Sequence, residues 1–342
     1  MVGVIAGVLV LLLVAVLWPG RGLAARVRRV RREAERVRLE DALKHLLDCE
    51  RAGRAATVET LAGRIEVSRG VASEVLTRLE DRGLAVASPQ GFALTEPGRA
   101  YGLRVLRTHR LWERYLADRT GVPAPDWHGE AERVEHELTV AEVERLATRL
   151  GDPRYDPHGD PIPTAGGEIP APAGVSLGRV AAGRSVVIRH LEDEPREVFE
   201  RLVSMGLAPG EVLEVVSADA GGRAGRVRIR LRGEEHVLRA VDAANVTVEV
   251  LDAEGVSGPR RTLANVGRGE TVRVTALSPA CQGPQRRRLL DLGVVPGARI
   301  TPELASGWGD PVAYRIRGAL IALRAEQASW IEVEREPTER TG

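Results

Sequence analysis

The stretch DWHGEAERVEH, residues 126–136, decides the fold of this chain. His128, Glu132 and His136 recur at intervals of four residues, so one face of a helix would carry them together. Glu135 precedes His136 directly, and either residue could complete this face. The stretch therefore concentrates imidazole and carboxylate groups, the side chains that bind divalent metal ions.

A second pair of such side chains precedes the stretch. His109 and Glu113 are also four residues apart. Three of the seven histidines thus fall within 28 residues, each near a carboxylate. Imidazole and carboxylate donors together suit Mn²⁺ or Fe²⁺. A solvated face of ion pairs would show the same spacing, so spacing alone leaves both interpretations open.

The composition excludes several classes of protein. The 342 residues are enough for two or three domains. The 49 basic and 48 acidic side chains nearly cancel, which excludes a globally basic protein that coats nucleic acid. Two cysteines, Cys49 and Cys281, cannot form a disulfide framework or a cysteine-only metal site. The sequence lacks a nucleophile–base pair, a phosphate-binding loop and an open zinc triad, so we do not expect an enzyme.

The first 38 residues combine an apolar run with a cluster of arginines. Residues 2–18 carry no charge, and a helix of that length spans about 25 Å, close to a bilayer core. Eight arginines follow between residues 21 and 38, and no basic residue precedes the run, which argues against a signal peptide. We therefore expect a transmembrane helix at 1–19 and a basic juxtamembrane helix at 20–38 that attracts membrane lipid. The protein would be a single-pass protein of the cell membrane, with most of its chain in the cytoplasm.

Residues 39–98 have the pattern of a winged helix-turn-helix. Three helices are expected, the third over 69–82, and a two-stranded hairpin follows it. The third helix would lie in the major groove of DNA. Its candidate DNA-binding side chains are Arg69, Ser73, Thr77 and Arg78. Residues 39–100 hold eight basic and ten acidic side chains, so a protein-interaction module is the alternative.

The C-terminal part repeats itself after a segment rich in proline and glycine at 151–174. The Pro-Gly turn at 209–210 matches the one at 296–297, an offset of 87. The Arg-Gly pair at 232–233 matches the one at 317–318, an offset of 85. Nearly constant offsets indicate a duplication, and short strands with tight turns favour a small barrel in each copy.

The two copies, 175–252 and 260–336, follow a linker at 164–174. Their shared core is a hydrophobic-Gly-hydrophobic-x-Pro-Gly turn. This turn resembles that of the FeoA-type SH3-like module, which occurs in ferrous-iron transport proteins and in metal-dependent repressors. The resemblance implies a fold more than a chemistry.

Residues 39–163 resemble the diphtheria-toxin-repressor family of metal-dependent transcription regulators. The motifs that carry the resemblance are His109-Arg110-Leu111-x-Glu113-Arg114, Glu130-Ala131-Glu132-x-x-Glu135-His136 and Asp156-Pro157-His158-Gly159-Asp160-Pro161-Ile162-Pro163. The family implies a winged helix that binds a double-stranded DNA operator. It also implies a metal-binding and dimerisation domain, here 99–163, that forms a homodimer.

The resemblance implies two metal positions. The primary site would use Asp41, Glu132, Glu135 and His136, and the ancillary site His109, Glu113 and His128. In the manganese branch a carboxylate stands where this chain has Lys44, so we expect one tightly held ion in the primary site. Iron-branch members add a glutamate and a glutamine from the SH3-like domain; here 192–194 (Glu-Asp-Glu) lie near the expected place, without a matching glutamine.

These observations predict a multi-domain α+β chain. It would contain a single N-terminal transmembrane helix, a winged helix-turn-helix, an all-α metal-binding and dimerisation domain and two small SH3-like β-barrels. We expect a membrane-anchored DNA-binding regulator of metal homeostasis that depends on Mn²⁺ or Fe²⁺. The ion would set the angle between winged helix and dimerisation domain, and thereby the distance between recognition helices. The alternative is a membrane-bound metal-sensing adaptor that contacts a ferrous-iron transporter through its FeoA-type copies without binding DNA.

Overall fold

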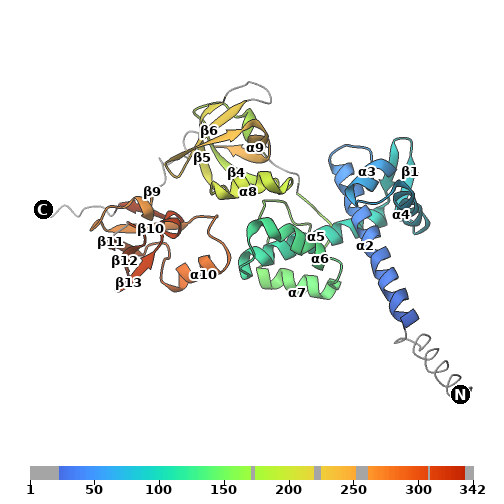
Figure 1. Cartoon of the computed structure of the whole chain (residues 1–342), viewed down its shortest axis with the longest axis horizontal. Coiled ribbons are helices and arrows are strands. Elements are labelled where there is room, and N and C mark those ends of the chain that lie inside the picture. The colour runs from blue at the N-terminus through green and yellow to red at the C-terminus, as the bar shows by residue number, and fades with distance from the viewer. Residues whose placement is uncertain (1–22, 171–173, 219–224, 252–260, 307–308, 336–342) are drawn as a thin grey trace, which may run out of the picture. The chain divides into compact units, whose positions relative to one another are not determined.

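Helix α2 (Leu23–Arg51) is the first element of the described chain (Figure 1). The computed structural model describes residues 23–170, 174–218, 225–251, 261–306 and 309–335. From Leu39 onward, α2 buries Leu39, Leu43, Leu46 and Leu47. Their spacing of three or four residues places them on one face of the helix, which packs on the elements that follow.

A helix-turn-helix and a hairpin pack against this face. The elements are α3 (Val58–Arg64), α4 (Arg69–Asp81), β1 (Ala85–Ser88) and β2 (Gly91–Leu94). Both helices begin at a hydroxyl N-cap: Thr57 accepts from a backbone amide of α3 and Ser68 from one of α4. The hairpin is antiparallel and pairs Ala85 with Leu94. Gly91 has φ +138°, and a Cβ there would lie 2.2 Å from the carbonyl oxygen of Ala56, so only glycine fits this turn.

The metal-binding region is helical. Its elements are α5 (Glu96–Arg119), η1 (Ala124–Asp126), α6 (Trp127–Val134) and α7 (Val140–Leu150). Helix α6 ends at Val134, and a turn follows it. The expected continuous helical face from His128 to His136 is therefore wrong: Glu135 and His136 lie in the turn, whereas Glu132 remains on the helix.

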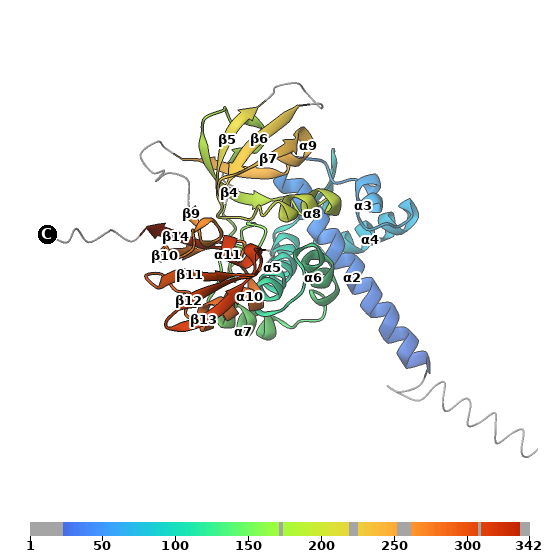
Figure 2. The same ribbon diagram turned by 60° about the vertical axis from the view of Figure 1, so that its left-hand side comes forward.

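The first FeoA-type copy is an antiparallel sheet with short helices between strands (Figure 2). Its elements are β3 (Val175–Ser176), η2 (Leu177–Arg179), β4 (Ser185–Leu191), α8 (Arg196–Ser204), β5 (Val212–Ala218), β6 (Arg226–Leu231), β7 (Glu234–Arg239), α9 (Ala240–Ala244) and β8 (Val246–Val250). The strand order is β3-β8-β4-β5-β6-β7. Alternate residues of β4 and β5 and the apolar face of α8 form its core, as their burial shows.

The second copy repeats this arrangement. Its elements are β9 (Arg261–Thr262), η5 (Leu263–Asn265), β10 (Val272–Leu277), α10 (Gly283–Asp291), β11 (Arg299–Ala305), β12 (Val312–Ile316), β13 (Ala319–Leu323), α11 (Ala325–Ser329) and β14 (Ile331–Arg335). Its order, β9-β14-β10-β11-β12-β13, is that of the first copy. Arg232 and Arg317, equivalent residues of the two copies, both have positive φ, at 52° and 47°. The predicted duplication is confirmed.

The predictions of a transmembrane helix and of a cell-membrane location are corrected. Among the described residues, no helix is both long enough and apolar enough to cross a bilayer. The longest of them, α2, carries many arginines, and charged side chains are costly in a hydrocarbon core. The fold class is thus helical domains with SH3-like β domains. Residues 1–19, to which the transmembrane prediction refers, lie outside the described residues.

Contacts between residues divide the chain into two compact units. The described residues of the first unit extend to His109 and include Glu132–Val143 and Pro163–Glu168. The second unit comprises Arg110–Ala131, Glu144–Ile162 and the described residues from Ile169 onward. Each unit contains one cluster of side chains that can bind a metal ion.

Candidate metal centres

The first cluster joins Asp41 of α2 with Glu135 and His136 from the turn after α6. Nε2 of His136 lies 3.3 Å from Oδ1 of Asp41 and 3.4 Å from Oε1 of Glu135. Atoms that share one ion at bonds of about 2.1 Å lie roughly 3.0–3.5 Å apart. The three donors therefore fit a single divalent cation, and their N/O chemistry suits Mn²⁺ or Fe²⁺.

Glu40 orients the imidazole of His136. Its Oε2 lies 2.5 Å from Nδ1 of His136, and its Oε1 accepts a hydrogen bond of 2.5 Å from the hydroxyl of Tyr101. A carboxylate on one ring nitrogen fixes a ligand histidine so that the other nitrogen faces the metal. Glu40 therefore leaves Nε2 of His136 directed at Asp41 and Glu135.

Lys44 and His109 compensate the buried charge of Glu135. Nζ of Lys44 donates to both carboxylate oxygens, at 2.8 and 3.0 Å, and Nδ1 of His109 lies 2.5 Å from Oε2. Burial would raise the pKa of Glu135, but His109 and Lys44 outweigh it and lower that pKa. Lys44 thus pairs with a carboxylate of the first cluster, and its ammonium would oppose a second cation there.

Glu132 does not join this cluster. Its side chain is exposed on α6, and the three donors that converge are those of Asp41, Glu135 and His136. The reason is the end of α6 at Val134, because the turn gives the next two residues a different direction from that of the helix. The structure therefore brings together three of the four residues predicted for the primary site.

The second cluster gathers Glu113 of α5, His128 of α6, His158 and Asp193. Nδ1 of His128 lies 2.9 Å from Oδ2 of Asp193 and 3.4 Å from Oε1 of Glu113. Nε2 of His158 lies 3.6 Å from the same Glu113 oxygen and 3.9 Å from Oδ2 of Asp193. The predicted ancillary set is also brought together: His109, Glu113 and His128 offer ligand atoms that all lie within 4.8 Å of one another. Nδ1 of His109 also lies 2.5 Å from Oε2 of Glu135 in the first cluster.

His158 is the strongest indication of a metal ion in this second cluster. Its side chain is 3% exposed, and neither ring nitrogen has a hydrogen-bond partner among the described residues. A buried imidazole without a partner is costly unless a ligand satisfies it. The rings of Trp127 and Phe199 hold it edge-on, with centroids 5.7 and 5.0 Å away. Gly159 brings the loop against β4, since a Cβ there would lie 1.9 Å from the carbonyl oxygen of Arg189.

Sequence reasoning did not assign His158 or Asp193 to a site. The signal for His158 was present in the motif at 156–161, where it precedes a glycine of positive φ. Asp193 belonged to the acidic triplet at 192–194, and the sequence could not show which of the three faces the cluster.

Both clusters hold a histidine with a raised pKa. Burial lowers the pKa of His136, but Asp41, Glu40 and Glu135 outweigh it and raise the pKa to about 9. Burial likewise lowers the pKa of His158, and Glu113, Asp156 and Asp193 raise it to about 9. A metal ion must therefore displace a proton from each imidazole.

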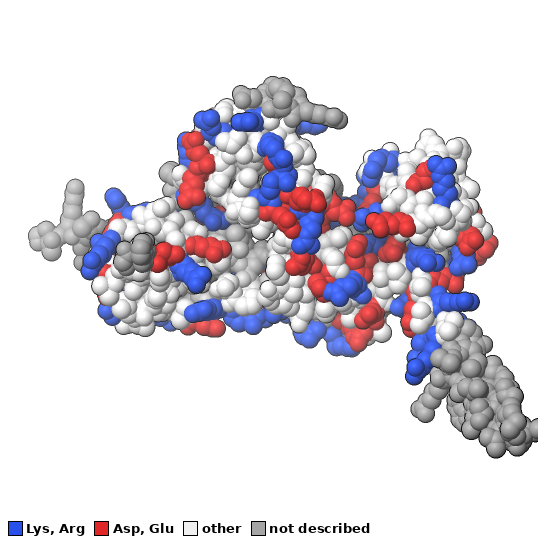
Figure 3. Space-filling view, in the orientation of Figure 1, with Lys and Arg blue, Asp and Glu red and all other residues white. Residues whose placement is uncertain are grey.

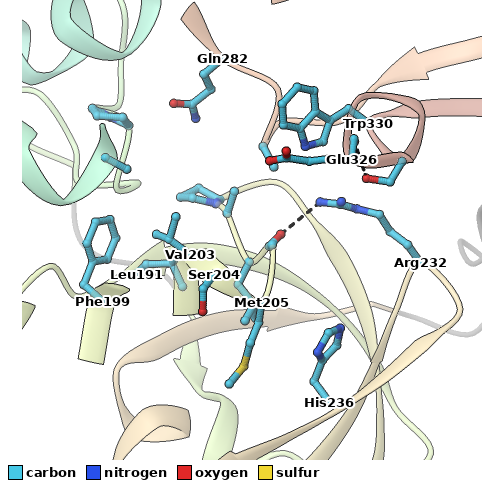
Figure 4. A pocket seen from close by; sticks show the side chains of 18 of the residues that line it. Leu191, Phe199, Val203, Ser204, Met205, Arg232, His236, Gln282, Glu326 and Trp330 are labelled. Atoms are coloured by element: carbon cyan, nitrogen blue, oxygen red, sulfur yellow. Dashed lines mark hydrogen bonds between the residues drawn. The ribbon is translucent and has the colours of Figure 1, made fainter. Parts of the chain in front are cut away.

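A cavity of about 350 Å³ lies among Phe199, Arg232 and Trp330 (Figure 4). Trp127 and Phe199, which hold His158, line it together with Trp330 of the second FeoA-type copy. Arg232 also lines it, but its Nη2 donates to Glu211 at 2.9 Å and to the carbonyl of Gly206 at 3.1 Å. The charge of this guanidinium is thus already compensated.

The predicted DNA-contacting side chains lie on α4. Arg69, Ser73, Thr77 and Arg78 are all exposed. Arg69 lies 3.9 Å from a carboxylate oxygen of Glu59, and exposed pairs of this kind contribute little. These four side chains are therefore accessible to a ligand as large as DNA.

Sequence profiles match most of the described chain. The profile "Iron dependent repressor, metal binding and dimerisation domain" matches residues 95–164. The profile of the FeoA domain matches residues 175–250 and 261–335. The iron-dependent repressor IdeR of Mycobacterium tuberculosis is 33% identical over 208 residues, which cover 57% of this chain and 89% of the relative. This chain belongs to the diphtheria toxin repressor family. The family predicted from the motifs and the two FeoA domains are thereby confirmed.

Further relatives and solved structures agree with this assignment. The diphtheria toxin repressor of Corynebacterium glutamicum is 29% identical over 62% of this chain and 95% of its own length. A manganese-dependent transcriptional repressor in complex with manganese gives a TM-score of 0.56 at 28% identity, over 62% of this chain and 99% of that one. The manganese regulator SloR gives 0.52 at 26% identity, over 62% and 98%.

The names of these relatives bear on two predictions. They are iron-dependent and manganese-dependent repressors, which agrees with Mn²⁺ or Fe²⁺ as the cofactor and with a protein that is not an enzyme. A shorter match, 39% identical over 82 residues, covers 24% of this chain and 18% of a probable metal transport system membrane protein of Chlamydia trachomatis.

We predict that Mn²⁺ binding releases protons and weakens as the pH falls. His136 and His158, with pKa values of about 9, are protonated at pH 7 and must lose a proton to bind metal. Below pH 9 the apparent affinity of each cluster should rise up to about tenfold per pH unit. Calorimetric titrations at pH 7 in two buffers with different ionisation enthalpies should give different heats. Equal heats in both buffers would contradict the assignment of these imidazoles.

We also predict that Lys44→Glu strengthens Mn²⁺ binding at the first cluster by about tenfold or more, or adds a second ion there. The change removes the ammonium that pairs with Glu135 and supplies an oxygen donor. Lys44→Gln, the matched control, removes the charge without adding a carboxylate and should have a smaller effect. Both are measured by calorimetry with Glu113 and His158 replaced by alanine, so that the signal comes from the first cluster. Affinity unchanged in both variants would mean that Lys44 does not oppose the metal.

Proposed function

We propose that this chain is a transcriptional repressor that binds operator DNA as a homodimer when it holds Mn²⁺ or Fe²⁺. The names of its relatives support repression and dependence on metal. The match to a metal-binding and dimerisation profile over residues 95–164 supports the homodimer. The contacts of the first cluster suggest how metal and DNA binding are linked.

The observation that carries the proposal is the position of Asp41 in α2. Two residues later in the same helix, Leu43 is fully buried in the helix-turn-helix core. Asp41 therefore belongs to the DNA-binding element, while Glu135 and His136 come from the turn after α6. An ion held by all three would fix the orientation of the helix-turn-helix relative to that turn. In a dimer this orientation sets the distance between the two α4 helices, which must match the spacing of the DNA half-sites.

The second cluster would act on the connection between the first FeoA domain and the metal-binding domain. Asp193 follows β4 of the first FeoA domain, whereas Glu113 and His128 belong to α5 and α6. An ion bound by these residues and His158 would tie the FeoA domain to the metal-binding domain. Because binding of an ion favours the arrangement in which its ligands converge, each ion would shift the population toward the DNA-binding form.

We predict that Glu135→Ala and His136→Ala each abolish metal-dependent DNA binding. The measurement is fluorescence anisotropy of the full chain on a duplex selected from a random library, with and without Mn²⁺. Glu132→Gln is the matched control, because this carboxylate is near in sequence but outside the cluster. His158→Ala should remove one Mn²⁺ from the stoichiometry and leave the first ion bound, since the two clusters share no ligand.

Two results would contradict the proposal. The first is specific DNA binding that is the same with Mn²⁺ and with a chelator. The second is tight binding of Mn²⁺ to the full chain without selection of any duplex sequence. This second result would favour the alternative, a metal-sensing adaptor that contacts a ferrous-iron transporter.

A further inference from the structure

The N-terminal half of α2 extends beyond the helix-turn-helix. The first residue of α2 buried in the core is Leu39, so the sixteen residues 23–38 precede the core contacts. At 1.5 Å per residue they form a helical rod of about 24 Å. We call residues 23–38 the arginine arm.

The arm carries positive charge that the described chain does not neutralise. It holds seven arginines and two glutamates. Five of the arginines are exposed and have no ion-pair partner among the described residues: Arg26, Arg29, Arg31, Arg32 and Arg38. Figure 3 shows Lys and Arg side chains gathered along this part of α2. Residues 39–100, in contrast, hold eight basic and ten acidic side chains.

The arm is fixed to the recognition helix. It is one continuous helix with the buried part of α2, so it does not swing as a linker would. Glu35 of the arm also accepts a hydrogen bond of 3.0 Å from Nη2 of Arg82, and its Oε1 lies 3.4 Å from Nη1 of Arg78. These contacts join the arm to the C-terminal end of α4. Any DNA that α4 contacts is therefore close to the arm.

We propose that the arginine arm binds the phosphate backbone of duplex DNA beside the site contacted by α4. The inference rests on the proposed function and names a second DNA-binding element. DNA binding depends on neutralisation of phosphates by Lys and Arg, and the helix-turn-helix has no excess of these side chains. The arm supplies this excess at a fixed position, and its contacts are independent of DNA sequence.

The arrangement of side chains favours DNA over an anionic membrane surface. Helices that lie in a membrane interface separate a basic face from a face of large apolar residues such as Trp, Phe and Leu. At 100° per residue, Arg26, Arg29, Arg31 and Arg32 point to several sides of the helix. The exposed apolar side chains between them are the small Val27 and Val30.

The test replaces all five unpaired arginines of the arm by glutamine in the full chain. The log of the affinity is measured against the log of the salt concentration, on the selected duplex with Mn²⁺ and on an unrelated duplex with a chelator. We expect the magnitude of the slope to fall on both duplexes by up to about 4.5 for each bound chain, because each of the five lost phosphate contacts removes about 0.9. The affinity at about 0.15 M salt should fall at least tenfold. The Mn²⁺ stoichiometry should stay the same, since none of the five is a ligand.

Two control variants make the result specific. Replacing the five arginines by lysine keeps the charge and should keep the salt slope. The charge-matched control replaces five exposed arginines of the FeoA domains that have no ion-pair partner within the described ranges by glutamine: Arg179, Arg184, Arg226, Arg228 and Arg268. This second control should leave the slope as in the parent chain.

The outcomes separate the arm from the proposed function. An unchanged slope in the glutamine variant overturns the arm inference, whatever the metal dependence. Loss of binding to vesicles of phosphatidylglycerol and phosphatidylcholine, together with an unchanged DNA slope, would assign the arm to a membrane and also overturns it. If the parent chain binds the unrelated duplex through the arm but selects no operator, the arm inference stands and the repressor proposal fails.

Discussion

The buried carboxylate of Glu135 is the constraint on which the first unit depends. Its side chain is fully buried, and a buried charge without compensation is strongly destabilising. Lys44 of α2 and His109 of α5 supply that compensation, so one charge holds two helices to the turn after α6. Because an ion at Glu135 would contact Asp41 of the same helix α2, the interaction that stabilises this junction is also the one that a metal would replace.

The two clusters have a similar composition but position their histidines in different ways. Each combines side chains of residues 96–162 with a side chain from another part of the chain: Asp41 of α2 in the first cluster and Asp193, after β4, in the second. The first has an oriented histidine, because Glu40 and Tyr101 fix one ring nitrogen of His136. In the second cluster the histidine is held by packing, because the rings of Trp127 and Phe199 contact His158 edge-on. Hydrogen bonds orient His136, and aromatic rings position His158. In both histidines one ring nitrogen faces carboxylates.

Local patterns in the sequence predicted the family, the FeoA duplication and the helix-turn-helix pattern, because hydrophobic spacing and turn residues specify these features. The family resemblance also implied Asp41, Glu135 and His136, which the structure brings together. The resemblance also implied Glu132, but α6 ends at Val134, and no pattern in the sequence marks the residue where this helix ends. Asp193 joins Glu113 across 80 positions of chain, and local spacing carries no information on such a contact. The transmembrane prediction concerned residues 1–19, which lie outside the described residues. None of the described helices is long and apolar enough to cross a membrane.

Helix α2 carries the arginine arm, Asp41 of the first cluster and the core leucines on one continuous helix. Asp41 and Leu23 are 18 positions apart, about 27 Å along the axis. A tilt of about 5° at Asp41 would therefore displace the far end of the rod by roughly 2 Å. A movement of a fraction of an ångström among ligand atoms is thus magnified by simple leverage. If an ion at Asp41 tilts α2, the length of this helix would set how far the arginines move.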